Sequence, residues 1–551
     1  MREKRNIGYV LLPVVLCAGL IGGVFIGRFV EQRRVSPSQE KVHRILDLIE
    51  SQYVDEIDID SLLEASIPDL LTSLDPHSAY IPASDLKQTN EELEGSFGGV
   101  GVSFQIINDT VNVIEVVSGG PAEKVGLLPG DKIIEAGGKQ LSGAKATNED
   151  VFSTLRGKEG TKVNIKVKRS SSKSLLEYEI VRGEIPSNSV DAAYLMSDNK
   201  TGYIKVSKFA RTTYSEFLNA LTNLKEKGAT GYMVDLRNNS GGYMDQAIFM
   251  ANEFLPSGEM IVYTKGRTPE NETIAISDGT GGFQDADITV LTNEFSASAS
   301  EIFAGAMQDN DRGVVIGRRS FGKGLVQNQT ELPDSSAIRL TVARYYTPSG
   351  RSIQKEYSRG RDGKYELDIV DRFNHGEFYS QDSIKFDQSK KFSTVGGRTV
   401  YGGGGIMPDI FVPEDTTGYT SYYIEAVNKG LIQKFCHEMS EKYRPLMKEK
   451  TLAAMNRIVP REDSLLSLFV DWAATQGLPA RWYYINQSRD LLLNQLRAVL
   501  ARDLVGYDAF IEILNERDAT VKKAQEIMMS GKSKEMLKAD QSKTAKDDKT
   551  K

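Results

Sequence analysis

The stretch from Asp287 to Gln327 constrains this chain more than any other part of the sequence. It begins with a short apolar run, passes through an alternation of serine and alanine, and continues as a helical pattern of apolar residues. This order predicts a strand, a tight turn and a helix, with three serines at the turn. The first turn of a helix has unpaired N–H groups and a partial positive charge, which suits a nucleophile whose attack creates an oxyanion.

A serine hydroxyl needs a base, and the same stretch offers a lysine. Lys323 lies in the glycine-flanked segment SFGKGLVQ, and burial can lower the pKa of a lysine until the neutral amine accepts a proton. Gln327 follows four residues later, so in an extended segment it points to the same side and can orient the amine. A serine–histidine–aspartate triad also stays open, because the chain has four histidines outside this stretch: His43, His77, His375 and His437.

Both features also have a purely structural interpretation. Ser298 and Glu301 have the S-x-x-E spacing of a capping box, which many helices use without any chemistry. A lysine between two glycines is compatible with a solvated loop. Spacing alone therefore leaves the catalytic and the structural interpretation open.

The two halves of the stretch together resemble the signature of the C-terminal processing peptidases, or tail-specific proteases, of peptidase family S41. In that family a motif S-A-S-A-S-E is followed by F-G-K-G-x-V-Q, and this sequence carries SASASE and FGKGLVQ. The resemblance implies Ser298 as the nucleophile, Lys323 as the general base and Gln327 as the residue that orients the lysine. We expect no cofactor, and His437 alone beside Cys436 provides too few ligands for a metal site.

Length and composition agree with a large multidomain protein. The 551 residues suffice for several domains, and 40% hydrophobic residues suffice for packed cores. A formal net charge of -7 without a basic stripe argues against nucleic acid as a partner. The two cysteines, Cys17 and Cys436, lie in an apolar segment and in a helical pattern, so we expect buried or lipid-facing residues instead of a disulfide framework.

The apolar segment from Ile7 to Val30 follows Arg2, Lys4 and Arg5 and has about the length of one bilayer span. No small-residue cleavage site follows it, and Cys17 lacks the preceding small residue of a lipoprotein site. We therefore expect an uncleaved signal anchor in residues 1–36. The large body behind it and the resemblance predict a single-pass protein of the bacterial inner membrane, with its catalytic body in the periplasm or elsewhere outside the cytoplasm.

Residues 37–93 show helical periodicity up to the turn LDPHSAY. We expect His77 in this turn to be a hydrogen-bonded turn residue, since the turn itself accounts for the segment. In the family such a helical segment helps to pair subunits, so the resemblance implies a homo-oligomer, a dimer, formed through helical segments.

Residues 94–184 contain short strand-like runs between glycine and proline turns. The segments FGGVGV and GGPAEKVGLLPGDKI resemble the carboxylate-binding loop of a PDZ domain and the segment after its second strand. The resemblance implies that a substrate tail adds to an open strand edge, with its carboxylate on the loop Gly99, Val100, Gly101 and Val102. Arg169 matches an arginine that couples such domains to the protease body, although a plain surface arginine is the alternative. The expected strands are 101–107, 111–117, 132–136, 162–168 and 175–181.

Strands and helices alternate over residues 185–413, which predicts a layered α/β core. The turn DLRNNSGG follows a buried strand, at the edge where α/β proteins place their sites. The resemblance implies that Gly242, with Gly241 as the alternative, and the amide of Ala299 form the oxyanion hole. It also implies a crotonase-like core, so the fold class is mixed α/β. The polar segment at about 355–399 is expected to be a surface insert, with a lid as one interpretation.

Helical periodicity returns over residues 414–530, with expected helices at 422–448, 464–474, 481–504 and 508–528. The last residues, 531–551, are rich in lysine and aspartate and lack aromatic side chains, so we expect them to be disordered.

Taken together, the sequence predicts a membrane-anchored serine endopeptidase that cleaves proteins recognised by their exposed, apolar C-terminal tails. A catalytically silent PDZ scaffold or adaptor is the rival interpretation, and it predicts erosion of Ser298, Lys323 or the glycine turn, all of which are intact. A crotonase-like acyl-transfer enzyme is a third interpretation, for which the sequence offers no phosphate-binding signature beyond generic glycines.

Overall fold

The computed structural model describes residues 36–143, 146–360, 363–385 and 387–538. The expected membrane anchor, Ile7 to Val30, lies outside these residues. Among the helices that are described, none combines the length and the apolar composition needed to cross a bilayer. The chain divides into two compact units, Met1–Leu74 and Asp75–Lys551, and each is described by itself.

Within residues 36–74, the first unit contains two helices, α2 (Pro37–Gln52) and α3 (Ile59–Thr72), which agree with the expected helical segment. A capping box begins α2, because the Ser36 hydroxyl accepts from the Gln39 N–H and the Gln39 side chain accepts from the Ser36 N–H. No residue of α2 is buried. Its apolar residues Val42, Ile45 and Leu48 are all exposed.

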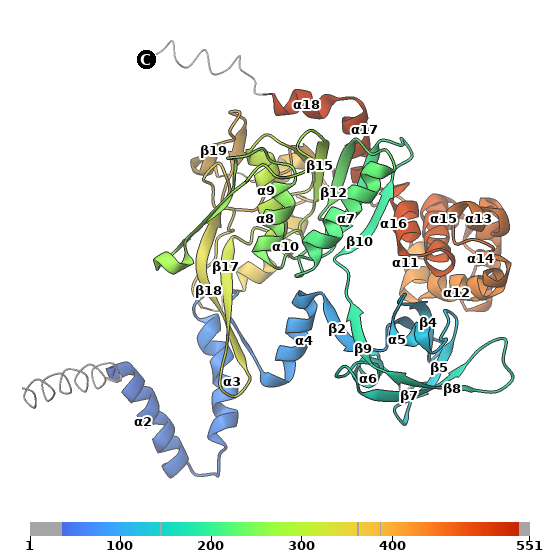
Figure 1. The fold of residues 1–551 in the computed structure, drawn as a ribbon, viewed down its shortest axis with the longest axis horizontal. Helices are drawn as coiled ribbons and strands as arrows, with labels where there is room; N and C mark the ends of the chain where they lie inside the picture. The colour runs from blue at the N-terminus through green and yellow to red at the C-terminus, as the bar shows by residue number, and fades with distance from the viewer. Residues whose placement is uncertain (1–35, 144–145, 361–362, 386, 539–551) are drawn as a thin grey trace, which may run out of the picture. The chain divides into compact units, whose positions relative to one another are not determined.

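A six-stranded sheet forms the centre of the α/β core in the second unit (Figure 1). Its order is β10-β11-β12-β15-β16-β21, and every neighbouring pair is parallel except β10 and β11. This arrangement brings the carboxyl ends of β12 and β15 to the same edge, where both candidate turns begin. The strands are β10 (Val190–Leu195), β11 (Thr201–Val206), β12 (Gly231–Asp235), β15 (Asp287–Thr292), β16 (Val314–Gly317) and β21 (Ile410–Phe411).

Helices cover both faces of this sheet. Successive strand residues point to opposite faces, so in β12 Tyr232 and Val234 pack with one group of helices while Met233 packs on the other side against α17. The core therefore has three layers, as the layered α/β prediction requires. The helices of the first group are α7 (Thr213–Glu226), α8 (Met244–Asn252) and α9 (Ala299–Asp309), and α17 spans Ala519–Met529.

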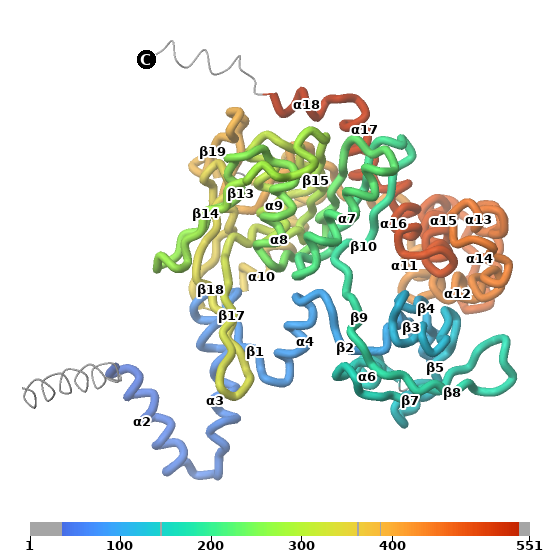
Figure 2. The backbone as a smooth tube through the Cα atoms, in the orientation of Figure 1, coloured from blue at the N-terminus to red at the C-terminus, as the bar shows by residue number. Residues whose placement is uncertain are grey.

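A second sheet contains the hairpin of β17 (Leu325–Glu331) and β18 (Ala337–Tyr346), which run side by side in Figure 2. The short strand β1 (Ala79–Ile81) pairs antiparallel with β18 and ties the turn before it to this hairpin. Gln327 on β17 lies opposite Thr341 on β18. On the other side of β18 lies β13 (Met260–Gly266), followed by β14 (Thr273–Ile276).

The β-rich domain within residues 94–184 has its own apolar core. Its main sheet has the order β3-β4-β5-β7-β8, and each expected strand is confirmed to within one residue at either end. Because β3 is the last strand of the sheet, its second edge has no partner strand among the described residues. The strands are β3 (Val102–Ile107), β4 (Thr110–Val116), β5 (Lys132–Ala136), β7 (Lys162–Lys168) and β8 (Leu176–Val181), and α6 spans Asn148–Leu155.

The C-terminal region is helical, as expected, but two of the expected long helices are broken. Gly430 adopts a left-handed conformation with φ 64°, so the expected helix 422–448 becomes α11 (Ser421–Asn428) and α12 (Leu431–Tyr443). The Asp518 side chain caps a new helix by accepting from the Val521 N–H, so the helix expected at 508–528 becomes α16 (Tyr507–Asn515) and α17. The remaining helices are α13 (Leu452–Ile458), α14 (Glu462–Thr475) and α15 (Trp482–Leu504).

The prediction of disorder from residue 531 onward is wrong at its start. A helix, α18 (Lys532–Leu537), follows the left-handed Gly531. Its Ser533 is buried, and Met536 and Leu537 pack against the apolar cluster beneath α17. The prediction relied on the charged composition of this segment and did not take its few apolar residues into account. Residues 539–551 lie outside the described part of the chain.

The segment at about 355–399, expected to be a surface insert, is folded and keeps much of its surface exposed, including Leu367, Val370 and Phe373; its origin as an insert stays a prediction. This segment contains α10 (Lys364–Asn374) and the strands β19 (Lys391–Ser393) and β20 (Thr399–Tyr401). Tyr365 and Arg372 of α10 are buried. The segment packs into the core through charged and aromatic side chains, which a reading for apolar periodicity does not detect.

The buried ion pair of Arg351 and Asp309 gives a stability prediction. Both side chains are fully buried and hydrogen-bonded, with Arg351 Nη2 2.7 Å from Asp309 Oδ1. Arg351→Met leaves the Asp309 carboxylate buried without its partner, so we expect unfolding of the full-length chain to require about 3–5 kcal/mol less free energy. Arg489→Met is the control, because its pair with Asp463 is exposed and should contribute at most about 1 kcal/mol. Equal denaturation curves for the two variants would contradict this account.

Candidate active site

Ser298 lies at the turn between β15 and α9 in a conformation that is rare for a residue with a side chain. Its φ of 57° and ψ of −114° place strain at a strand-to-helix turn, as in the nucleophile elbow of α/β-hydrolases. The turn after β12 packs directly against it. A Cβ on Gly241 would lie 2.7 Å from the Ser298 Cβ and 3.0 Å from the Ala299 nitrogen. Only glycine allows this approach.

Two main-chain N–H groups beside Ser298 are available for a ligand. The Gly241 N–H is engaged, since it donates to Asn239 Oδ1 at 2.8 Å. The N–H groups of Gly242 and Ala299 have no acceptor in the part of the chain that the structure describes. Gly242 has a φ of 142°, and a Cβ there would lie 2.1 Å from the Phe209 carbonyl oxygen. The geometry therefore favours Gly242 over Gly241 as an oxyanion donor.

Lys323 lies in the extended segment that leads into β17. Its Nζ donates to Gln327 Oε1 at 3.2 Å, so the structure places Gln327 beside the amine. Burial lowers the pKa of Lys323, the positive charge of Arg339 lowers it further, and the carboxylates of Glu301 and Asp75 oppose the change. The lysine therefore loses its proton more readily than an exposed lysine does.

No hydrogen bond joins Lys323 Nζ to the Ser298 hydroxyl among the described residues. Catalytic hydrogen bonds often form or tighten only when substrate is bound. The histidines offer no substitute in the second unit, where His375 is exposed, His437 is buried in α12, and His77 bonds to Tyr365 instead of the serine.

Glu301 joins the serine and the lysine segments, a role that the capping-box spacing did not reveal. Its carboxylate is fully buried and accepts from the N–H groups of Ser298 at 2.9 Å and Lys323 at 2.8 Å. It also accepts from the Gly322 N–H at 2.7 Å and the Ser320 hydroxyl at 2.5 Å. Burial raises the pKa of Glu301 to about 7, against the effect of these four donors. Its sequence spacing indicated only the bond to Ser298.

Tyr345 is a second residue that joins the same two segments. Its hydroxyl is hydrogen-bonded to the carbonyl oxygens of Ser298, at 3.1 Å, and of Lys323. The side chain is buried, and burial raises its pKa far above the usual range. The tyrosine therefore remains a neutral donor, and nothing in its strand pattern distinguished it from a core residue.

The glycine-rich loop before β3 has the features expected of a carboxylate-binding loop. Val100 is buried and Gly101 has a φ of 82°. Their N–H groups have no acceptor within the described residues, and buried N–H groups without a partner are rare unless a ligand supplies one. Gly99 is paired in a short ladder with Gly183, and Val102 begins β3.

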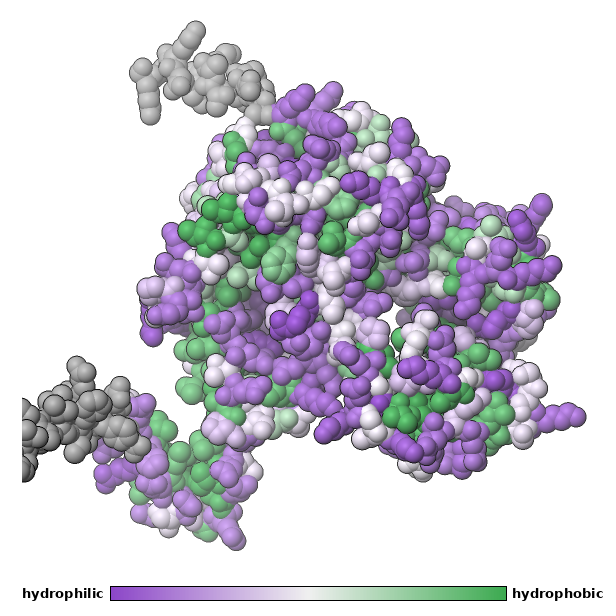
Figure 3. All heavy atoms as spheres, viewed as in Figure 1, coloured by the Kyte–Doolittle hydropathy of each residue, from purple (hydrophilic) through white to green (hydrophobic). Residues whose placement is uncertain are grey.

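Apolar side chains lie along the open edge of β3. Phe104 on β3 and Phe152 on α6 have ring centroids 5.2 Å apart, and Phe152 is about half exposed. Figure 3 shows hydrophobic side chains gathered on the domain that contains β3 to β8. This surface can accommodate an apolar side chain of a peptide that pairs with β3.

Arg169 bonds to residues of its own domain. Its guanidinium forms a forked pair with Asp131, with both nitrogen–oxygen distances at 2.7 Å, and donates to the Gly126 carbonyl at 2.8 Å. The structure therefore holds Arg169 within its own domain, and its expected coupling role stays a prediction.

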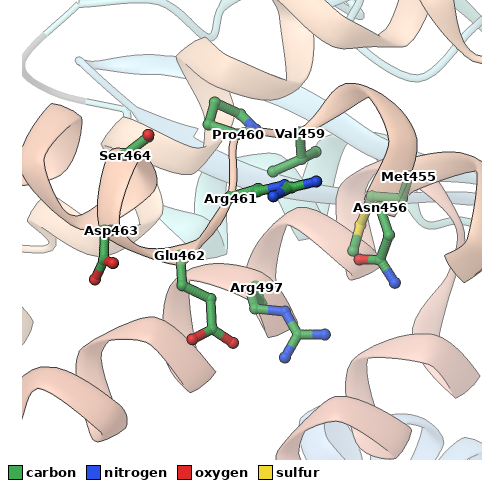
Figure 4. A pocket seen from close by; sticks show the side chains of 9 residues that line it. All are labelled: Met455, Asn456, Val459, Pro460, Arg461, Glu462, Asp463, Ser464 and Arg497. Atoms are coloured by element: carbon green, nitrogen blue, oxygen red, sulfur yellow. The ribbon is translucent and has the colours of Figure 1, made fainter.

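The second unit also contains two hollows that are lined by neither Ser298 nor Lys323. One of about 750 Å³ is lined by residues at the carboxyl ends of the central strands, among them Asp235, Asn293 and Phe295. The other, of about 570 Å³, lies among the C-terminal helices beside Arg461 and Arg497 (Figure 4). No group of three potential metal ligands occurs in the part of the chain that is described.

Three parts of the chain match known protein families. Residues 200–360 match the model of peptidase family S41, residues 98–180 match the model of the PDZ domain, and residues 422–506 match a family of unknown function. A carboxy-terminal-processing protease of Bartonella bacilliformis is 40% identical over 315 residues, which cover 56% of this chain and 71% of that protein. The carboxy-terminal processing protease CtpA of Bacillus subtilis is 34% identical over 322 residues, 58% of this chain and 67% of that protein.

Among solved structures, the photosystem II D1 C-terminal processing protease is similar at 27% sequence identity, with 60% of this chain and 93% of that chain covered and a TM-score of 0.32.

The role of Glu301 leads to a test by Glu301→Gln. The amide can still accept at its oxygen, but its NH₂ group faces main-chain N–H donors, so the serine and lysine segments shift apart. Because a misplacement of about 1 Å can lower a rate by on the order of 100-fold, we expect that loss in the turnover number of peptide cleavage. Glu253→Gln is the matched control, since Glu253 is also a buried acceptor, for Tyr214 and Gly282, far from the turn in sequence. Equal turnover in both variants would refute the role.

Proposed function

This chain belongs to peptidase family S41 and is a serine-type peptidase of the carboxy-terminal processing group with a PDZ domain. On this premise we propose that it cleaves polypeptides with a dyad of Ser298 and Lys323. We further propose that the PDZ domain first captures the C-terminal tail of the substrate. The observation that supports the dyad most directly is the shared acceptor: one buried carboxylate, Glu301, receives the N–H groups of both residues. The strained serine and the buried lysine are thereby held in one framework.

The proposed reaction begins when neutral Lys323 takes the proton of the Ser298 hydroxyl. The serine oxygen attacks the peptide carbonyl, and the N–H groups of Gly242 and Ala299 donate to the oxyanion that forms. The lysine ammonium then gives its proton to the departing amine, leaving an acyl-enzyme. A water molecule, deprotonated by the lysine, releases the acyl group and restores the serine.

Substrate selection is proposed to start at the loop before β3. A terminal carboxylate accepts from the unpaired N–H groups of Val100 and Gly101, and the tail continues along the free edge of β3 as an added strand. The rings of Phe104 and Phe152 favour apolar residues in such a tail. A PDZ scaffold that binds tails without cutting them would use the same loop, so tail binding by itself does not test the proposed cleavage step.

The setting of the enzyme is also part of the proposal. The apolar segment Ile7 to Val30 anchors the chain in the bacterial inner membrane, with the body outside the cytoplasm. The exposed apolar residues of α2, Val42, Ile45 and Leu48, offer a helical surface through which two copies associate. Arg169 is proposed to leave Asp131 and contact the protease core when a tail is bound.

The dyad predicts a strict requirement for both side chains. We expect the full-length chain to cut an unfolded reporter protein with a free apolar tail, and Ser298→Ala and Lys323→Ala each to lower turnover by about 10,000-fold or more. Both variants should still bind the tail peptide with the affinity of the parent, measured by fluorescence polarisation. If the parent binds the tail but cleaves no better than Ser298→Ala, the scaffold alternative is favoured.

The lysine base also predicts how the rate depends on pH. Because only the neutral amine accepts the serine proton, kcat should rise as pH increases through the lowered pKa of Lys323 and then level off. Arg339→Gln removes a positive charge that lowers this pKa, so the rising limb should move to higher pH, and added salt should reduce the difference. Arg344→Gln, on the same strand, is the control. An unchanged limb in Arg339→Gln would contradict a lysine base.

A further inference from the structure

The turn Asp75-Pro76-His77-Ser78 is hydrogen-bonded to β18, the strand that pairs with Gln327 of β17. Asp75 Oδ1 accepts from the His77 N–H at 2.8 Å and from the Thr341 hydroxyl at 3.1 Å. The Ser78 hydroxyl accepts from the Thr341 N–H at 3.1 Å. Since Thr341 lies opposite Gln327 in the β17–β18 hairpin, these bonds place the His77 backbone against Gln327.

The His77 carbonyl determines which way the Gln327 amide points. Gln327 Nε2 donates to the His77 oxygen at 2.9 Å, and Gln327 Oε1 accepts from Lys323 Nζ at 3.2 Å. The opposite orientation would place the amide oxygen against the His77 carbonyl, which is repulsive, and would present the amide NH₂ to the lysine, which is repulsive when the lysine carries its proton. The carbonyl of His77 thus keeps an acceptor in front of the lysine.

The His77 ring is held in turn by the segment 355–399. His77 Nε2 lies 2.6 Å from the Tyr365 hydroxyl, and the two rings meet edge to face with centroids 5.2 Å apart. Tyr365 is on α10 and is almost fully buried.

The segment 355–399 also holds the loop that carries the lysine. The Lys355 N–H donates to the Gly322 carbonyl at 2.9 Å. The Arg372 guanidinium donates to the carbonyls of Arg319 at 2.8 Å and Ser320 at 3.1 Å. The segment 355–399 therefore supports the surroundings of Lys323 at two places: it bonds to the loop before Lys323, and it bonds to His77, whose carbonyl accepts from Gln327.

His77 is poorly suited to carry a proton itself. Burial and the nearby charge of Lys323 lower its pKa to about 4, with Lys355 acting in the same direction and Asp75 against it. The ring is therefore neutral where the lysine titrates, and it adds no charge that would change with the base.

We propose that His77 and Tyr365 are positioning residues for the lysine base: the Tyr365 hydroxyl holds the His77 ring, and the His77 carbonyl holds the Gln327 amide that accepts from Lys323. This inference rests on the proposed function of Ser298 and Lys323. It assigns a role in the active site to α10, which lies in the segment expected to be a surface insert.

Tyr365→Phe in the full-length chain is the deciding variant, because it removes one hydroxyl and leaves the packed ring. We expect kcat for the tailed reporter to fall by about tenfold with KM changed less than about twofold, since positioning acts on the reacting groups and not on tail capture. His77→Ala should cause a similar loss, and the double variant should be no worse than His77→Ala, because the two act through one contact. Tyr379→Phe, on an exposed tyrosine of the same segment, should match the parent.

The pH dependence separates positioning from a general loss of structure. The rate at which an organofluorophosphonate labels Ser298 should rise with pH, and in Tyr365→Phe the rising limb should move to lower pH, because the lysine ammonium has lost a well-placed acceptor. A parental kcat in Tyr365→Phe, additive losses in the double variant, or a lower labelling yield with an unmoved limb would each overturn the proposal. If Ser298→Ala or Lys323→Ala cleaves like the parent, the proposed dyad fails instead.

Discussion

The carboxylate of Glu301 is the contact on which the rest of the site depends. A buried carboxylate is costly unless hydrogen bonds replace the lost water, and this one has four donors within the core. Three of the donors belong to the segment Ser320 to Lys323 and one to Ser298, so satisfying the carboxylate also brings the two segments together. The turn before α9 could form by local folding alone, but that would not bring the segment of Lys323 to Ser298. The shared acceptor makes the separation between serine and lysine a property of the buried core.

The elements around this contact act mainly by excluding water from the lysine. The turn at His77, the hairpin of β17 and β18, and α10 all lie against the segment that carries Lys323. Burial is the largest cause of the lowered pKa of this lysine. A histidine base has a suitable pKa when exposed, whereas a lysine acquires one only from its surroundings. For the proposed lysine base, the surrounding packing is therefore part of the chemistry, whereas around a histidine base it would be structural.

Local sequence patterns predicted the parts of the site that form within one stretch of chain. The strand-to-helix turn at Ser298, the glycines at 241 and 242, and the strands of the PDZ domain follow from periodicity and turn residues. The contacts that complete the site join distant segments: His77 and Tyr365 are separated by 288 positions. The spacing of Glu301 from Ser298 indicates a capping box, and this local role already explains why a glutamate occurs there. The charge of Arg372 indicates exposure, although the side chain is buried and donates to the carbonyls of Ser320 and Arg319, which lie 52 and 53 positions away.

The proposed binding loop and the proposed catalytic residues belong to different domains of this molecule. The proposed carboxylate-binding loop has its unpaired N–H groups in a domain with its own apolar core, whereas the segments of the proposed dyad are held by Glu301, Tyr345 and the segment 355–399 in the α/β core. A tail bound at β3 can therefore influence cleavage only by delivering the chain to Ser298 or by changing contacts between the two domains. The lysine bonds to Gln327 and not to Ser298 among the described residues. If the proposed dyad acts, its final alignment therefore falls to the bound substrate, whose carbonyl would lie between the serine and the N–H groups of Gly242 and Ala299.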